Sequence, residues 1–144
     1  MVRDMTVGDL EKIVEIENAT FSMPWSKEGF IKALEMKSNK YIVFEEHGEI
    51  LGYCGYYGVV DEAEITVVCV KDTARKRGIA KIMLSELFIK AKESGIERII
   101  LEVRVSNEPA IRLYERMGFN NLGVRRDFYE NPREDAYIME INLC

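Results

Sequence analysis

Two hydrophobic periods alternate along the chain and predict its elements. Segments with apolar residues at helical spacing predict four helices, at about residues 6–18, 26–36, 78–94 and 107–117. Shorter apolar or alternating runs predict strands at about residues 2–5, 41–44, 50–60, 64–70, 98–105, 119–124 and 137–143. Strands follow one another early in the chain and alternate with helices later. This order predicts an α/β fold, with a mixed central sheet of about six to seven strands and helices on both faces.

Turn and cap residues support several of these boundaries. His47-Gly48 lies between two apolar runs and predicts a hairpin turn. Thr6 is a typical cap for the first helix, and Gly95 and Gly118 are expected to end the third and the fourth. The strand at 98–105 alternates most regularly, which places Glu102 on its polar face.

Composition narrows the classes of function. The 144 residues contain no linker, repeat or low-complexity tract, so we expect one domain over residues 1–144. The chain carries 20 basic and 25 acidic side chains, a formal charge of −5, which disfavours a general nucleic-acid binder. His47 is the sole histidine and lies in the predicted turn, so we expect no histidine-rich metal site.

The spacing of the cysteines and the length of the apolar runs indicate the cellular compartment of the protein. Cys54, Cys69 and Cys144 have the spacing of neither a disulfide framework nor a zinc site. No basic-then-apolar leader opens the chain, and no apolar run approaches the roughly 20 residues that span a bilayer. We therefore expect a cytoplasmic protein with reduced thiols, no metal and no membrane partner.

A basic segment precedes the third predicted helix. Residues 71–81 contain five basic residues and one acid, so the rest of the chain has a net charge of −9. Free backbone N–H groups and the helix dipole favour a small polyanion at such a junction, and Gly78 allows it to approach the main chain closely. The P-loop and dinucleotide patterns are both absent. A solvated basic turn is the alternative, and nucleic-acid binding is disfavoured because no aromatic residues accompany the charges.

The same segment resembles a family signature. Arg75-Lys76-Arg77-Gly78-Ile79-Ala80 is similar to the R/Q-x-x-G-x-G/A signature of the GNAT superfamily of N-acetyltransferases, with Ala80 in place of the more usual second glycine. The order of predicted elements follows this family from residue 2 to residue 143, which implies a single-domain GNAT fold. The resemblance implies acetyl-CoA as cosubstrate. Its implied contacts are the backbone of the loop and the strand before it, at Val68, Cys69, Val70, Arg75, Lys76, Arg77, Gly78, Ile79, Ala80 and Lys81.

Three further strings resemble the bacterial ribosomal-protein-alanine N-acetyltransferases (RimI-like). They are Pro24-Trp25-Ser26, Leu101-Glu102-Val103-Arg104-Val105-Ser106-Asn107 and Arg133-Glu134-Asp135-Ala136-Tyr137-Ile138-Met139. The resemblance implies direct acetylation of the N-terminal alanine of a basic small-subunit ribosomal protein. It also implies that Glu102 is the general base, that Tyr114 is the proton donor and that Asn107 contacts the cofactor.

Each candidate residue has a structural alternative. Glu102 could be an exposed or ion-paired strand residue, with Arg104 as the partner in the second case. Tyr114 lies on the apolar stripe of its helix and could be a packing residue, although its reference pKa of about 10 lies above the thiol value of about 8.5 and suits a proton donor. Trp25 could line the substrate groove or belong to the core. Cys69 is better explained as a small buried residue than as a nucleophile, because no histidine that could activate it lies near it in sequence.

Two functional alternatives remain open at this stage. The first is an acetyltransferase for lysine side chains or for a small amine such as a polyamine. The second is a coenzyme A-binding sensor without turnover, which the presence of both Glu102 and Tyr114 disfavours. The segment at residues 133–135 could recognise the substrate peptide or close a hairpin.

Overall fold

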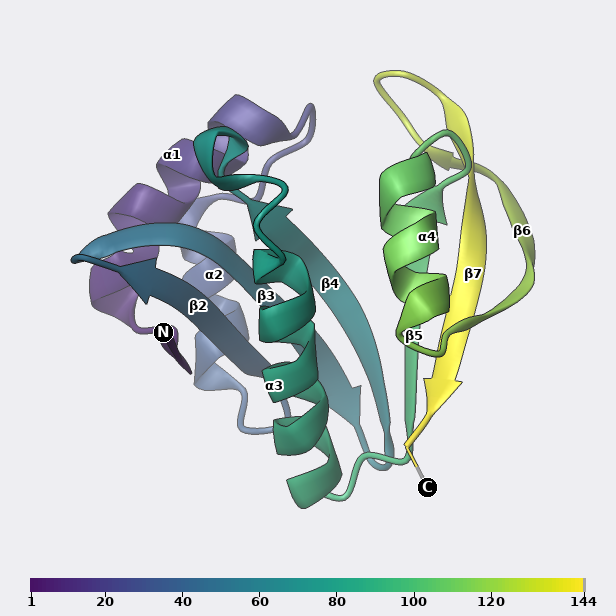
Figure 1. The fold of residues 1–144 in the computed structure, drawn as a ribbon, viewed down its shortest axis with the longest axis horizontal. Helices are drawn as coiled ribbons and strands as arrows, with labels where there is room; N and C mark the ends of the chain where they lie inside the picture. The colour runs from purple at the N-terminus through teal and green to yellow at the C-terminus, as the bar shows by residue number, and fades with distance from the viewer. Residues whose placement is uncertain (144) are drawn as a thin grey trace.

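One seven-stranded sheet runs through the computed structural model, which describes residues 1–143 (Figure 1). The strand order is β1-β2-β3-β4-β5-β7-β6, and the pairs are antiparallel except for β4 with β5. The strands are β1 (Val2–Asp4), β2 (Lys40–Glu46), β3 (Glu49–Val59), β4 (Glu62–Val70), β5 (Arg98–Arg104), β6 (Asn120–Tyr129) and β7 (Glu134–Asn142). The predicted mixed α/β sheet is confirmed. Cys144 lies outside the described residues.

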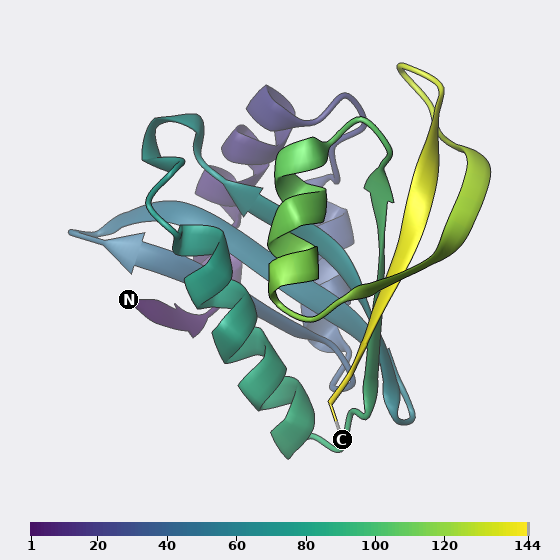
Figure 2. The ribbon, with the colours of Figure 1, turned by 45° about the vertical axis from the view of Figure 1, so that its right-hand side comes forward.

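Helices cover both faces of this sheet, as Figure 2 shows. The helices are α1 (Leu10–Thr20), α2 (Lys27–Glu35), α3 (Ile79–Glu93) and α4 (Glu108–Arg116), with short 3-10 turns η1 (Val7–Asp9) and η2 (Asp72–Ala74). On one face, α1 and α2 bury Ile13 and Phe30 against the sheet. On the other face, α3 and α4 bury Leu87 and Tyr114. None of the helices within residues 1–143 has both the length and the apolar character needed to cross a membrane.

Three predicted boundaries are wrong. Thr6 precedes the 3-10 turn η1 rather than the first α-helix, which begins at Leu10. The last hairpin is longer than predicted: β6 continues to Tyr129 and β7 begins at Glu134. The alternation of polar and apolar residues fails in β6 because this strand lies at the sheet edge and is exposed on both sides along most of its length.

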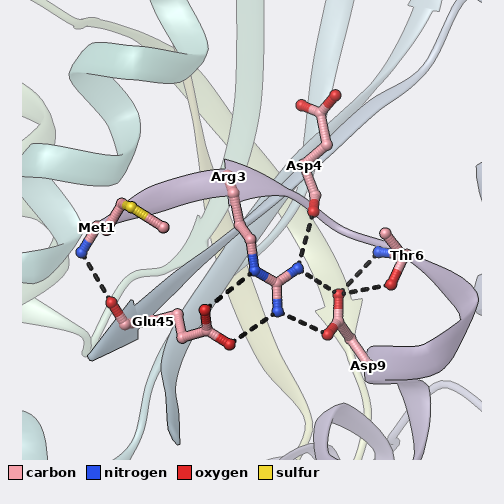
Figure 3. A network of polar contacts seen from close by, with 6 residues as sticks. All are labelled: Met1, Arg3, Asp4, Thr6, Asp9 and Glu45. Atoms are coloured by element: carbon pink, nitrogen blue, oxygen red, sulfur yellow. Dashed lines mark hydrogen bonds and ion pairs between the residues drawn. The ribbon is translucent and has the colours of Figure 1, made fainter. Parts of the chain in front are cut away.

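The N-terminal strand is held by one arginine (Figure 3). Arg3 in β1 donates hydrogen bonds to both carboxylate oxygens of Asp9, at 2.8 and 2.9 Å, and to both oxygens of Glu45 in β2. The hydrogen bonds from Arg3 lower the pKa of the Asp9 carboxyl, although its burial opposes them. Asp9 also accepts hydrogen bonds from the amide and the hydroxyl of Thr6. This network joins β1, η1 and β2, and it lies apart from the cavity described below.

The sheet opens between its two parallel strands. Only residues 62–64 of β4 pair with β5, opposite residues 98–100, and beyond them the two strands diverge (Figures 1 and 2). The edge of β4 from residue 65 to residue 70 therefore faces β5 without a strand partner. Main-chain groups on such an edge can hydrogen-bond to a ligand.

Candidate active site

A cavity of about 760 Å³ lies where β4 and β5 separate. Its walls come from the end of α1, the segment at residues 21–25, strands β4 and β5, helix α4 and the end of the β6–β7 hairpin. Five of the predicted site residues line it: Trp25, Val68, Glu102, Asn107 and Tyr114. The tertiary structure thus brings together residues that are up to 89 positions apart in the chain.

Glu102 enters the cavity from β5. Its side chain is 10% exposed, and one carboxylate oxygen lies 3.5 Å from Nη1 of Arg125 in β6. Burial raises the pKa of the Glu102 carboxyl, the nearby charge of Glu64 raises it further, and Arg125 lowers it. The alternative pairing with Arg104 is wrong, because Arg104 lies 3.2 Å from Glu134 in the neighbouring strand β7. A mostly buried carboxylate with a raised pKa is suited to proton transfer.

Tyr114 reaches the cavity from the opposite face of the sheet. It belongs to the core under α3 and α4, with its ring 5.6 Å from that of Phe119, and it is 8% exposed. Burial raises the pKa of its hydroxyl, and the groups of Cys54 and Tyr129 raise it further. Within residues 1–143 this hydroxyl has no hydrogen-bond partner in the protein. Tyr114 therefore packs as the alternative suggested, and its phenol remains available to a ligand in the cavity.

The gap between the two strands explains how Glu102 and Tyr114 can line the same cavity. Alternation along β5 places Leu101 and Val103 in the core with Tyr114, and Glu102 on the other face. In a closed sheet a glutamate and a tyrosine so placed would be separated by the strands. Because β4 and β5 diverge beyond their short paired region, both side chains line one cavity.

Trp25 and Asn107 each combine two roles. The indole of Trp25 is 5.2 Å from the ring of Phe30 and 6.4 Å from that of Tyr41, yet the residue is 36% exposed and lines the cavity. The side-chain oxygen of Asn107 accepts a hydrogen bond from the amide of Ala110 at 3.4 Å and caps α4, and this residue also lines the cavity. Neither residue has to leave its structural position to contact a ligand.

The predicted cofactor strand faces both sides of the sheet. Val68 lines the cavity, and Val68 and Val70 pack against the core under α3 and α4. Cys69 points to the α1 side, where it is buried and its sulfur lies 3.9 Å from the hydroxyl of Thr20. Burial raises the pKa of the Cys69 thiol, so the residue is a small buried side chain and not an activated nucleophile.

The basic segment forms a loop of unusual backbone shape outside the cavity. Lys76 and Gly78 both have left-handed conformations, with φ of 66° and 77°, and α3 begins directly after them at Ile79. A Cβ atom built on Gly78 would meet no other atom within 4 Å, so the space beside this residue is open. The first amides of α3, at residues 79–81, have no partner within the helix. This arrangement can bind an anionic group through the main chain.

The charges of this loop are partly neutralised within the protein. Arg77 donates to both carboxylate oxygens of Glu46, at 2.8 and 3.0 Å, and Arg75 pairs with Asp72 at 3.2 Å. No such ion pair within residues 1–143 involves Lys76 or Lys81. The amides of the loop and these two lysines are therefore the groups most available to an anion.

Sequence reasoning missed part of the cavity wall. Residues 20–23 and 128–132 line it, and neither segment carries a charge or glycine pattern that marks a site. Asp135 closes the β6–β7 hairpin, since it accepts from the amide of Asp127 at 2.8 Å. Glu134 joins β7 to the segment before α4, since it accepts from the amide of Ser106 at 2.8 Å. Within residues 1–143, no group of three or more histidine, cysteine or acidic side chains could hold a metal ion.

Known proteins share this fold and much of this sequence. The sequence profile described as "Acetyltransferase (GNAT) family" matches residues 10–119. A relative from Bacillus subtilis (strain 168), provisionally named a [ribosomal protein bS18]-alanine N-acetyltransferase, is 36% identical over 143 residues, covering 99% of this chain and 95% of its own. The crystal structure of the ribosomal-protein-S18-alanine N-acetyltransferase from Escherichia coli has a TM-score of 0.91 and 28% identity, over 99% of this chain and 93% of that one. A fold neighbour at 23% identity, Arabidopsis thaliana NAA60, was solved in complex with acetyl-CoA (TM-score 0.88, 99% of this chain and 97% of that one).

Proposed function

This chain belongs to the acetyltransferase (GNAT) family and is an N-acetyltransferase, and from that premise we propose that it acetylates the α-amino group of a protein N-terminus with acetyl-CoA. The observation that carries the proposal is the cavity between β4 and β5, which brings a carboxylate and a phenol from opposite faces of the sheet to one place. We also propose that residues 1–144 form one domain.

The chain offers two surfaces for the cosubstrate. The open backbone beside Gly78 and the first amides of α3 would hold the pyrophosphate, with Lys76 and Lys81 close by in the chain. The unpaired edge of β4 at residues 68–70 would hydrogen-bond to the pantetheine arm. Bound in this way, acetyl-CoA supplies an activated acetyl thioester at the cavity.

The two candidate side chains have opposite tasks in the transfer. The neutral amine attacks the thioester carbonyl, so that a C–N bond forms as the C–S bond breaks. Glu102 accepts the proton that the amine loses, directly or through a water, since its raised pKa makes it a stronger base than an exposed glutamate. Tyr114 donates its phenolic proton to the departing thiolate. These roles for Glu102 and Tyr114 are those implied by the family resemblance.

The α-amine is the substrate group that a carboxylate base suits best. At pH 7 an α-amino group with a pKa near 8 is neutral roughly a tenth of the time, whereas a lysine near 10.4 is neutral about four times in ten thousand. By likeness to the relatives named for ribosomal protein bS18 and S18, we propose an N-terminal alanine of a basic ribosomal protein as the target, modified in the cytoplasm. The net charge of −9 outside residues 71–81 would attract such a segment at low salt.

Peptide acetylation followed by mass spectrometry tests this function. A basic peptide that begins with alanine should be acetylated once, at its N-terminus. The same peptide with a blocked N-terminus and free lysines should remain unmodified. Efficient modification of the blocked peptide would establish the lysine alternative instead, and binding of acetyl-CoA without transfer to peptides or small amines would establish the sensor alternative.

A further inference from the structure

A buried carboxylate that takes no part in the proposed chemistry lies beside the cavity. Glu17, in the second half of α1, is 3% exposed and forms part of the cavity wall. No cation pairs with it within residues 1–143. One carboxylate oxygen accepts a hydrogen bond from the hydroxyl of Tyr53 in β3 at 2.7 Å, and the other accepts one from the main-chain amide of Trp25 at 2.9 Å.

Burying such a carboxylate costs free energy, so its presence at this position indicates a role that an apolar residue could not perform. Desolvation of an unpaired carboxylate is unfavourable, and burial raises the pKa of Glu17 accordingly, while the bonds from Trp25 and Tyr53 oppose this effect. An apolar residue would fill the same position on the buried stripe of α1 without that cost. The two hydrogen bonds are the property that an apolar residue could not supply.

The hydrogen bond to Trp25 is the main polar restraint on the connection between α1 and α2. Within residues 1–143, it is the only hydrogen bond that reaches the main chain of residues 22–25. This segment lines the cavity through Ser22, Met23 and Trp25, and so forms one wall of the space that contains Glu102. Tyr53 is fully buried, and its hydroxyl fixes Glu17 from the sheet side.

We propose that Glu17 is a positioning residue, which tethers residues 22–25 and thereby sets the width of the cavity for the first residue of the substrate. The proposal rests on the proposed function, because it assigns this wall to the peptide. The tether depends on the length of the side chain at position 17 and on its ability to form both hydrogen bonds, and it does not depend on the charge of that side chain. A glutamine can keep both contacts: its amide oxygen accepts from Trp25, and its amide nitrogen donates to the hydroxyl of Tyr53, which accepts instead of donating. An aspartate keeps the charge but is one methylene shorter.

The sole tryptophan of the chain reports on the tether directly. We would compare the wild type with Glu17→Gln, Glu17→Asp and Glu17→Leu, and use Ile13→Val, a buried change in the same helix, as the matched control for a loosened core. Glu17→Leu and Glu17→Asp should shift the emission of Trp25 to longer wavelength and increase its quenching by acrylamide. Glu17→Gln and Ile13→Val should match the wild type. If Glu17→Leu does not fold, the Asp and Gln variants still decide the comparison.

Steady-state kinetics on peptides that begin with alanine or leucine then test the consequence for the substrate. Glu17→Asp and Glu17→Leu should raise the peptide KM roughly tenfold, the factor expected for one lost hydrogen bond, and should reduce the preference between the two peptides. The KM for acetyl-CoA should stay unchanged, and Glu17→Gln should restore the peptide KM. The tether would be overturned if Glu17→Asp had the fluorescence and the peptide KM of the wild type. It would also be overturned if Glu17→Gln shifted the emission of Trp25 and increased its quenching. If the wild type acetylates neither peptide, the proposed function fails, and the fluorescence comparison still decides whether Glu17 holds the segment.

Discussion

The pH dependence of the transfer offers the sharpest test of Glu102, because two neighbours shift its pKa in opposite directions. Arg125 lowers the pKa of the Glu102 carboxyl, and Glu64 raises it. Glu102 must be deprotonated to accept a proton from the amine. A higher pKa therefore moves the loss of activity to higher pH, and a lower pKa moves it to lower pH.

The size of the shift follows from the geometry. Two unit charges 3.5 Å apart attract each other by about 1.2 kcal/mol in a water-like dielectric, and this limit applies because the side chain of Arg125 is 56% exposed. Since one pKa unit corresponds to about 1.4 kcal/mol, removing Arg125 should raise the pKa of Glu102 by about one unit. Glu64→Gln should lower it.

The assay is the pH profile of kcat/KM for the peptide that begins with alanine. Between the pKa of Glu102 and that of the amine, log kcat/KM should rise with pH with a slope of one. Below the pKa of Glu102, where this carboxyl is protonated as well, the slope should be two. The pH of this break should move upward in Arg125→Ala and downward in Glu64→Gln. The shift in Arg125→Ala should shrink in high salt, which screens the exposed charge.

Arg126→Ala is the matched control. Arg126 is the next residue in β6, is exposed and forms no ion pair within residues 1–143. Its removal changes the net charge by the same amount and should leave the break where it is. Equal shifts in Arg125→Ala and Arg126→Ala, or shifts of the wrong sign, would refute Glu102 as the titrating base.

Three further expectations concern the proton donor, the loop and the N-terminal network. Tyr114→Phe keeps the core packing and should lower kcat by a factor of about 10² to 10⁴ without changing acetyl-CoA binding, measured by calorimetry. Gly78→Ala should raise the Kd for acetyl-CoA, whereas Gly48→Ala, at a hairpin glycine with the same φ and the same open space, should cause similar strain but leave that Kd unchanged. Asp9→Asn should lower the free energy of unfolding by about 1–3 kcal/mol at pH 7. Because Arg3 lowers the folded-state pKa of Asp9, this difference should be full above the unfolded-state pKa near 4 and disappear as the pH falls through the lower folded-state value, in urea titrations.

The local features of the chain could be predicted from sequence. The order of helices and strands, the turn at His47-Gly48 and the helix that begins after Gly78 all depend on spacing within a few turns or strand residues. The loop signature and the string at residues 101–107 are equally local, and the family resemblance that they carry implied a candidate base before any contact was known.

The site itself depends on contacts between distant segments. The separation of β4 from β5, which lets Glu102 and Tyr114 share a cavity, depends on where the pairing of these two strands ends, and it leaves no periodic mark in either strand. The partner of Glu102 is Arg125, 23 residues away on the edge strand β6, and not Arg104 two residues away, because neighbours across the sheet are set by strand order. Glu17 lies at helical spacing from the buried residues Leu10 and Ile13, but only the packing of α1 against β3 shows that its carboxylate is bonded to Tyr53. Short-range periodicity thus determined which elements form, and the long-range pairing of those elements determined which side chains meet.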